Sequence, residues 1–217
     1  MLKAVLFDMD GVIVDSEPEY CRVEMKIADQ FNIPFSIEEQ ESYKGINPIT
    51  MWEKLVSKHD LPYTAEMLYQ TEKNEMANYY KSGDIHAIPS TIELIKMLKS
   101  SGILLAVCSS SEKNNVINTL KRLNVISDIN VVVTYNDVYK SKPHPEIFLT
   151  AAEKLTVSPL ECIVVEDSLN GIIAAKAAGM KVIKYDSSPC KALYEDEADY
   201  IIKDMREISI ELLEKLL

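Results

Sequence analysis

Four acidic residues, arranged as two pairs, stand directly after two short apolar runs of the chain. Asp8 and Asp10 follow the first run, and Glu166 and Asp167 follow a run much later in the sequence. Burying an unpaired carboxylate is costly, and crowding several together adds mutual repulsion. If the two pairs meet in the fold, they need a hard cation, and ligands that are all oxygen suit Mg²⁺ better than zinc. The alternative is that each pair is a solvated end of a strand.

The elements that must position these residues are predicted from the hydrophobic pattern. Short apolar runs indicate strands, and stretches of helical period separate most of them; the runs are 4–7, 103–108, 131–133, 162–165, 182–185 and 201–202. Alternating strands and helices predict a parallel sheet that is covered on both faces. In such sheets ligands bind beyond the carboxyl ends of the strands. Asp8, Ser109, Lys142 and Glu166 are therefore expected at one edge.

A long interval between the first two predicted strands contains no strand pattern. Its segments indicate helices separated by proline and glycine breakers, at 18–31, 37–43, 49–58 and 65–80. We therefore expect an α/β fold, a Rossmann-like parallel sheet core formed by residues 1–15 and 84–217, with an inserted α-helical domain at residues 16–83. Ser16 followed by Glu19 predicts a capping box for the first helix of this insert, and Pro18 suits its first turn.

Composition excludes several classes of function. The chain has 217 residues and a formal net charge of −11, which argues against nucleic acid as a partner because phosphate backbones are bound by basic patches. No apolar stretch approaches 18 residues, so we expect neither an export signal nor a membrane span, and a cytoplasmic location. The four cysteines are far apart without a metal-ligand spacing, which favours free thiols and disfavours zinc.

Four stretches of the sequence together resemble the motifs of the haloacid-dehalogenase-like phosphotransferases. The stretch DMDGVIVDS is similar to the first motif, and the others follow in order: LAVCSSS with Ser109, KSKPHPEIF with Lys142, and VVEDSLNG with Glu166 and Asp167. The resemblance covers essentially the whole chain, and the interval between the first two motifs matches the helical cap of that family. Four motifs in order make a specific match, whereas the SKP element alone would be weak.

The resemblance implies a role for each acidic residue. Asp8 would attack a phosphoryl group and become an aspartyl phosphate, and Asp10 would protonate the leaving oxygen and then activate water. Mg²⁺ is the implied cofactor, held by Asp8, Asp10 and Asp167, where Asp10 can use its backbone carbonyl. Glu166 would either bind the metal or orient the groups around it.

Four further residues are implied to bind the transferring phosphoryl group. Ser109 would donate a hydrogen bond to its oxygens, helped by the backbone amides of Ser110 and Ser111. Lys142, which precedes a proline in a predicted loop, would offset the repulsion between the nucleophile and an anionic substrate. Ser111 has an alternative structural explanation, because it precedes a predicted helix and could be its cap.

The closest subgroup contains β-phosphoglucomutase and small sugar-phosphate phosphatases. The mutase pattern has a histidine where this chain has Tyr20, and an arginine that grips the second phosphate where this chain has Pro48. Proline cannot make that contact. Lys44 and Gly45 retain the phosphate-binding pair of the mutase cap, so β-phosphoglucomutase stays the leading alternative to a phosphatase.

The resemblance therefore implies a Mg²⁺-dependent phosphatase that hydrolyses a small phosphorylated metabolite, which the subgroup indicates is a sugar phosphate, and we expect the protein to be a monomer. Asp10 argues against dehalogenases and phosphonate hydrolases, which lack an acid at that position. A catalytically inactive binding protein that keeps the fold is the outside alternative. We also expect the cap to close over the substrate about hinges near residues 14–16 and 83–88.

Overall fold

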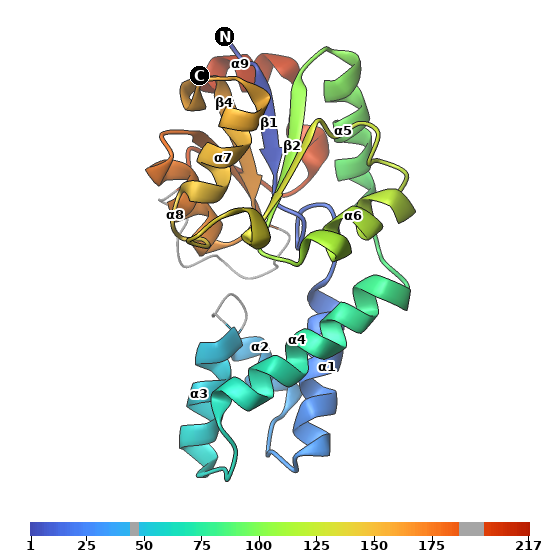
Figure 1. The fold of residues 1–217 in the computed structure, drawn as a ribbon, viewed down its shortest axis with the longest axis vertical. Coiled ribbons are helices and arrows are strands. Elements are labelled where there is room, and N and C mark those ends of the chain that lie inside the picture. The colour runs from blue at the N-terminus through green and yellow to red at the C-terminus, as the bar shows by residue number, and fades with distance from the viewer. Residues whose placement is uncertain (44–47, 187–197) are drawn as a thin grey trace. The chain divides into compact units, whose positions relative to one another are not determined.

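The computed structural model describes residues 1–43, 48–186 and 198–217, and its fold is shown in Figure 1. Contacts within the chain divide it into two compact units. The first unit consists of residues 1–15 and 86–217, and the second of residues 16–85. That the second unit acts as a cap for the first stays a prediction.

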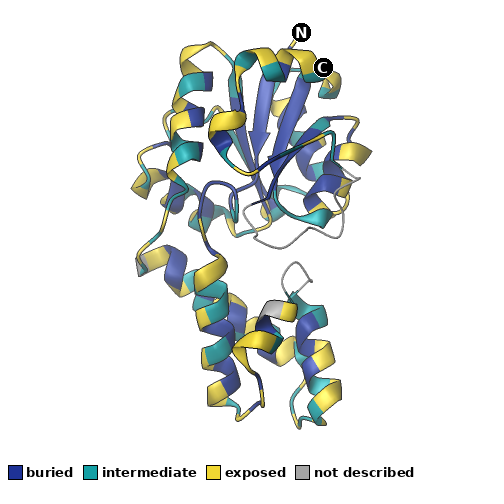
Figure 2. Ribbon diagram, turned by 180° about the vertical axis from the view of Figure 1, so that it is seen from behind, coloured by how far each residue is buried: buried dark blue, intermediate teal, exposed yellow. Residues whose placement is uncertain are grey.

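The first unit is built on a parallel sheet with the strand order β3-β2-β1-β4-β5-β6 over the described residues. Its strands are β1 (Ala4–Phe7), β2 (Leu104–Ser109), β3 (Val131–Thr134), β4 (Cys162–Glu166), β5 (Lys181–Tyr185) and β6 (Tyr200–Ile202). The predicted α/β fold with a parallel sheet is confirmed. Strands β1 and β4 are buried along their whole length, as parallel sheets covered on both faces require (Figure 2).

Helices cover the sheet. They are α5 (Pro89–Ser100), α6 (Lys113–Arg122), α7 (Glu146–Leu155), α8 (Leu169–Ala177) and α9 (Ile210–Leu216), with single 3₁₀ turns η1 (Tyr135–Asp137), η2 (Pro159–Glu161) and η4 (Met205–Glu207). Helices α7 and α8 pack on one face, α7 against β1, β2 and β3, and α8 against β4 and β5. The buried side chains of α7 and α8 form one hydrophobic cluster with buried side chains of β1, β2 and β4. Buried side chains of α5 are not part of this cluster, because α5 packs on β2 from the other face.

The register of the central strands aligns the positions that carry the acidic residues. Phe7, the last residue of β1, is opposite Val107 in β2 and Val165 in β4. Asp8 therefore leaves the sheet beside the ends of both neighbouring strands, where Ser109 and Glu166 lie.

The chain after β1 turns tightly and is tied to α5. Gly11 has a φ of 76°, a left-handed conformation that suits glycine, and its amide donates to the carbonyl of Val14 at 2.8 Å. The buried hydroxyl of Thr91 in α5 donates to the carbonyl of Val12 at 2.6 Å. These bonds fix the loop that carries Asp10.

The second unit is a helical bundle. Its helices are α1 (Glu17–Gln30), α2 (Ile37–Ser42), α3 (Pro48–His59) and α4 (Ala65–Ser82). Helices α1 and α3 pack against α4. The core between them includes the fully buried Ile27, Trp52 and Leu68. No described helix of the protein combines the length and the apolar character that crossing a membrane demands.

Two buried carboxyl groups lie inside this bundle. The indole of Trp52 donates to Glu72 at 2.6 Å, and the amide of Gln40 donates to Glu24 at 2.8 Å. Burial raises the pKa of Glu72 to about 7, although the Trp52 hydrogen bond opposes this, and the neighbouring Glu24 adds to the rise. Burial also raises the pKa of Glu24.

The predicted capping box at the start of α1 is wrong. Ser16 is the N-cap, but its backbone is helical (φ −92°, ψ −10°) and its side chain makes no capping bond. Glu19 forms an ion pair with Arg22 one turn later instead of reaching back to Ser16. The expectation for Pro18 is confirmed, because it lies in the first turn.

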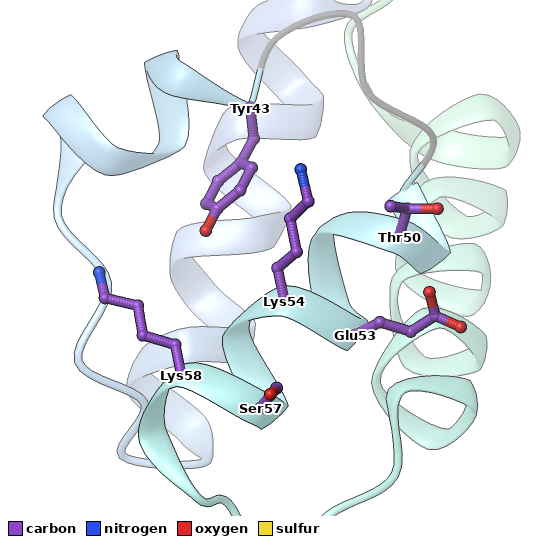
Figure 3. A pocket seen from close by; sticks show the side chains of 6 residues that line it. All are labelled: Tyr43, Thr50, Glu53, Lys54, Ser57 and Lys58. Carbon is purple, nitrogen blue, oxygen red and sulfur yellow. The ribbon is translucent and has the colours of Figure 1, made fainter.

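A shallow hollow lies on the outer side of α3 (Figure 3). Lys54 and Lys58 both line it, but each already has a partner. The ammonium of Lys54 lies 5.8 Å from the ring centre of Tyr43, and that of Lys58 lies 2.7 Å from Glu39. Among the described residues that line the hollow, Glu53 also contributes a negative charge.

Candidate active site

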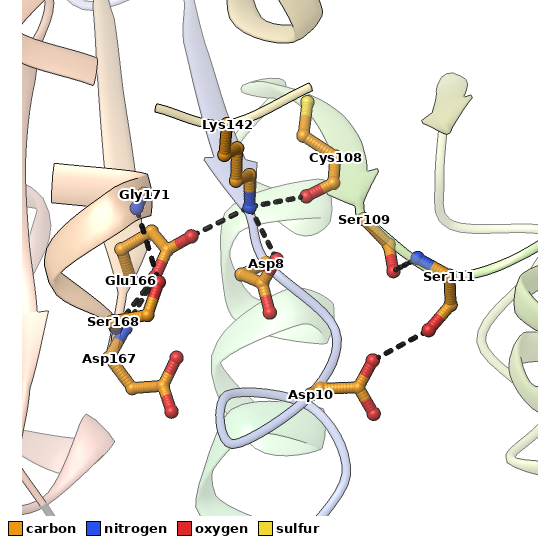
Figure 4. Close-up of polar contacts among 10 residues, drawn as sticks. All are labelled: Asp8, Asp10, Cys108, Ser109, Ser111, Lys142, Glu166, Asp167, Ser168 and Gly171. Atoms are coloured by element: carbon orange, nitrogen blue, oxygen red, sulfur yellow. Dashed lines mark hydrogen bonds and ion pairs between the residues drawn. The ribbon is translucent and has the colours of Figure 1, made fainter. Parts of the chain in front are cut away.

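Lys142 joins the ends of three strands (Figure 4). Its ammonium lies 2.5 Å from Oδ1 of Asp8 after β1, 2.6 Å from Oε1 of Glu166 at the end of β4, and 3.0 Å from the carbonyl of Cys108 in β2. The lysine side chain is 5% exposed, so these contacts form away from water. The structure thus brings Asp8, Lys142 and Glu166 together.

Both carboxylate oxygens of Glu166 have partners. Oε1 binds Lys142, and Oε2 accepts from the amides of Asp167 at 2.9 Å and Ser168 at 2.8 Å and from the hydroxyl of Ser168 at 2.9 Å. The hydroxyl of Ser168 in turn accepts from the amide of Gly171 and caps α8. Glu166 therefore ties the loop after β4 to Lys142.

Two glycines leave room for the carboxylates. A Cβ atom on Gly171 would lie 1.7 Å from Oε1 of Glu166, and one on Gly11 would lie 2.0 Å from Oδ2 of Asp167. Because neither position tolerates a side chain without movement, the glycines allow α8 to approach Glu166 and the loop after β1 to approach Asp167. The carboxylate of Asp167 thus reaches the same loop that carries Asp10.

The serines after β2 connect to Asp10. Ser109 is fully buried, and its hydroxyl oxygen accepts from the amide of Ser111 at 3.0 Å. The hydroxyl of Ser111 donates to Oδ2 of Asp10 at 2.9 Å. The suggested helix-cap explanation for Ser111 is wrong, because the N-cap of α6 is Glu112 and the hydroxyl of Ser111 is bound elsewhere. Ser110, by contrast, is exposed.

The site brings several carboxyl groups together away from water, which changes their pKa values. Burial raises the pKa of Asp8 to about 7; Lys142 opposes this, while Glu166 and Asp10 add to it. The pKa of Asp167 is raised well above its usual range by burial and by its carboxylate neighbours Glu166 and Asp8. Burial alone would lower the pKa of Lys142, but Asp8 and Glu166 outweigh that effect and raise it.

The donor set fits a hard divalent cation. In the part of the chain that the structure describes, no three His, Cys, Asp or Glu side chains are arranged to hold a metal by themselves. Mg²⁺ does not need such a cage, because it keeps several waters and binds one or two carboxylates together with substrate phosphate. Asp8 and Asp167 supply carboxylates whose raised pKa values a nearby cation would lower.

A protein-family model described as haloacid dehalogenase-like hydrolase matches residues 5–185, which is most of the chain. The chain belongs to the haloacid dehalogenase-like hydrolase family. The resemblance that the four motifs carry is thereby confirmed, and with it the prediction that the protein is an enzyme of this family.

The relatives of this hydrolase include a mutase and phosphatases. A β-phosphoglucomutase from Bacillus subtilis is 32% identical and covers 98% of this chain and 94% of its own. A phosphorylated carbohydrates phosphatase from Thermotoga maritima is 31% identical, with 93% and 94% covered. A solved structure of a HAD hydrolase, family IA, variant 3, from Entamoeba histolytica has a TM-score of 0.83 at 26% identity, with 99% of each chain covered. The β-phosphoglucomutase-like subgroup is thus confirmed.

Sequence patterns predicted some of the contacts in this candidate site and missed others. The position of Asp8, Ser109 and Glu166 after predicted parallel strands indicated that they converge at one edge, whereas no pattern pointed to Gly171. Its contact with Glu166 depends on how α8 packs against β4, which no local pattern records. The predicted phosphate-binding residues Lys44 and Gly45 lie outside the described residues.

Proposed function

We propose that this protein is a Mg²⁺-dependent phosphatase that hydrolyses a small phosphorylated carbohydrate through an aspartyl phosphate on Asp8. The observation that carries the proposal is the buried ammonium of Lys142, held 2.5 Å from Oδ1 of Asp8. A carboxylate in that position is poised to attack a phosphoryl group because the cation offsets the repulsion between two anions.

The first half of the reaction transfers the phosphoryl group to the protein. A carboxylate oxygen of Asp8 forms a bond to phosphorus while the bond from phosphorus to the ester oxygen breaks. Asp10 gives its proton to that oxygen, and the alcohol leaves. Lys142 and the hydroxyl of Ser109 stabilise the charge on the phosphoryl oxygens, which is where catalysis of phosphoryl transfer acts.

The second half returns the protein to its starting state. Water attacks the phosphorus of the aspartyl phosphate, the bond from Asp8 to phosphorus breaks, and inorganic phosphate leaves. Asp10, now a carboxylate, accepts the proton of the attacking water and is again an acid for the next cycle. Two aspartates separated by one residue can perform these different tasks because one contacts Lys142 and the other contacts Ser111.

Asp8, Asp167 and the backbone carbonyl of Asp10 are the groups we assign to the metal. Mg²⁺ would neutralise charge on the phosphoryl oxygens. Glu166 was predicted either to bind the metal or to orient its surroundings. The four donors that already occupy its oxygens support the orienting role, in which it positions Lys142 and the loop that carries Asp167.

The proposed substrate class draws support from the relatives and from the charge distribution. The relative from Thermotoga maritima is named for phosphorylated carbohydrates. The chain is strongly acidic overall, with a formal net charge of −11, so an anionic substrate needs local positive charge, and Lys142 provides it at the proposed nucleophile.

A β-phosphoglucomutase is the second candidate, favoured by the 32% identity to the Bacillus subtilis enzyme. Two positions weigh against it. Pro48, the first residue of α3, stands where the mutase pattern has a phosphate-binding arginine, and Tyr20 in α1 stands where that pattern has a histidine. A mutase must hold a second phosphate and exclude water, whereas a phosphatase must admit water.

One assay separates the two candidates. The protein with Mg²⁺ is offered a panel of phosphorylated carbohydrates that includes β-glucose 1-phosphate with its bisphosphate activator. A phosphatase releases inorganic phosphate from at least one member, and chelation of Mg²⁺ abolishes that release. Formation of glucose 6-phosphate without phosphate release would establish the mutase. Absence of turnover across the panel together with absence of Mg²⁺ binding would support an inactive binding protein.

A further inference from the structure

Ser111 bridges the ends of two neighbouring strands. Its hydroxyl donates to Oδ2 of Asp10, which follows β1, and its amide donates to Oγ of Ser109, the last residue of β2 (Figure 4). Asp10 and Ser111 are 101 residues apart in the sequence, so this contact forms only when the sheet does.

We propose that Ser111 is a positioning residue that holds the carboxyl group of Asp10 in place for proton transfer. This inference rests on the proposed function, in which Asp10 exchanges a proton with the ester oxygen and with water. A hydroxyl group suits the task because it can donate to one oxygen of the carboxylate and equally to the unprotonated oxygen of the carboxylic acid, which leaves the acid proton free for the ester oxygen. Ser111 can therefore stay bound to Asp10 in both halves of the reaction.

The surroundings of Ser111 argue against a simple role as a helix cap. Its hydroxyl does not cap α6, since the helix begins at Lys113 and its N-cap residue is Glu112. The amide of Ser111 donates to the hydroxyl oxygen of Ser109. The hydroxyl proton of Ser109 therefore remains available for a different acceptor. One residue thus orients both the proposed acid and the proposed phosphoryl-binding hydroxyl.

The decisive experiment compares two phosphate esters that differ in their need for an acid. An alkyl ester, the phosphorylated carbohydrate that turns over fastest in the panel, loses an alkoxide that must be protonated. The other ester, p-nitrophenyl phosphate, loses a stable phenolate. Ser111→Ala should slow single-turnover phosphorylation by the alkyl ester about tenfold or more, part of what a general acid contributes. Phosphorylation by the aryl ester should change little.

Three variants separate positioning from other effects. Ser111→Thr keeps the hydroxyl and should restore the rate with the alkyl ester. In an Asp10→Asn background, Ser111→Ala should cause no further loss, because its partner is already disabled. Ser101→Ala removes an exposed hydroxyl that is bonded to the carbonyl of Met97 at the end of α5, and it should alter neither rate.

The outcomes are distinguishable. Equal slowing with both esters in Ser111→Ala, or the same loss in the Asp10→Asn background, would overturn the inference while leaving the phosphatase intact. Weaker competitive inhibition of Ser111→Ala by inorganic phosphate would also overturn it, since Ser111 would then bind the phosphoryl group directly. If the unaltered protein turns over neither ester, the proposed function fails and the inference fails with it.

Discussion

The carboxylate of Glu166 holds the ammonium of Lys142 at 2.6 Å from one oxygen while its other oxygen binds the loop that follows β4. Both side chains are almost completely buried, at 0% and 5% exposure. A buried ion pair of this kind contributes little net stability, but losing one partner leaves an uncompensated charge. The pair therefore sets the position of Lys142 beside Asp8.

Replacing Lys142 by methionine should lower both activity and stability. The change leaves Glu166 and Asp8 facing each other without a cation, which should cost about 3–5 kcal/mol in the free energy of unfolding. Loss of the charge beside the transferring group should lower kcat/KM about 10²-fold or more. Phosphate release and urea unfolding measure the two effects.

The matched control is Lys140→Met, two residues earlier in the same loop, where the side chain is exposed. Neither kcat/KM nor the free energy of unfolding should change appreciably in Lys140→Met. If Lys142→Met resembled Lys140→Met, the assigned role of the buried ion pair would be wrong.

Adding a methyl group at Gly171 should damage the site even though alanine favours helices. The new Cβ would lie 1.7 Å from Oε1 of Glu166, so the carboxylate or α8 must move. We expect a loss of about 1–3 kcal/mol in unfolding free energy, as for other overpacked positions, and a reduced kcat. Asn170→Ala, the neighbouring and exposed position in α8, should be neutral or slightly stabilising. A fully active, more stable Gly171→Ala protein would contradict the packing argument.

The buried Thr91 tests how much its hydrogen bond to the loop after β1 contributes to stability. Thr91→Val removes the hydroxyl that binds the carbonyl of Val12, and leaving that carbonyl unsatisfied should cost about 1–3 kcal/mol. Thr119→Val in α6 is the matched control, because that hydroxyl is also fully buried but has no hydrogen-bond partner among the described residues. Thermal unfolding of both variants should show a lower midpoint for Thr91→Val and an equal or higher one for Thr119→Val.

The helical unit should become less stable as the pH rises from about 4.5 to about 7. Burial raises the pKa of Glu72 from 4.5 to about 7, so in this range the folded state holds a proton that the unfolded state has lost. Stability then falls with increasing pH and levels off above the pKa of the folded state. The full effect is on the order of 3 kcal/mol.

Glu72→Gln should remove most of this dependence, and the buried Glu24, whose pKa is also raised, should keep a smaller remainder. The glutamine oxygen can still accept from Trp52, so the variant should be more stable than the unaltered protein above pH 7 and nearly equal to it near pH 4.5. Fluorescence of Trp52, the single tryptophan of the chain, follows unfolding of this unit. Glu66→Gln, at an exposed position in α4, serves as control and should leave the slope unchanged. Parallel pH profiles for Glu72→Gln and the unaltered protein would rule out the buried carboxyl as the cause.

Local patterns predicted most of the sheet and the residues at its edge. Apolar runs such as 4–7 and 162–165 are short and continuous because both faces of those strands are covered, and the residues that follow them leave the sheet on one side. Helices α1 to α4 were predicted within one or two residues of their bounds. The motifs themselves, through the family, supplied the roles that patterns alone could not.

Long-range contacts and competing partners account for what the patterns missed. Ser111 looked like a helix cap because its nearest neighbours precede a helix, but its hydroxyl binds Asp10 across the sheet. Glu19 matched a capping box by spacing, yet Arg22 offered an ion pair one turn further on. The partners of Ser111 and Glu19 cannot be predicted from spacing, because each depends on which of two candidate groups the fold brings closer.

Trapping the phosphorylated protein tests the central claim most directly. The protein is mixed with Mg²⁺ and its best substrate, quenched in acid and analysed by mass spectrometry. The account predicts one added phosphoryl group on Asp8, accumulation of that species in Asp10→Asn when p-nitrophenyl phosphate is the donor, and none in Asp8→Asn. A phosphoryl group on another residue, or undiminished turnover by Asp8→Asn, would contradict it.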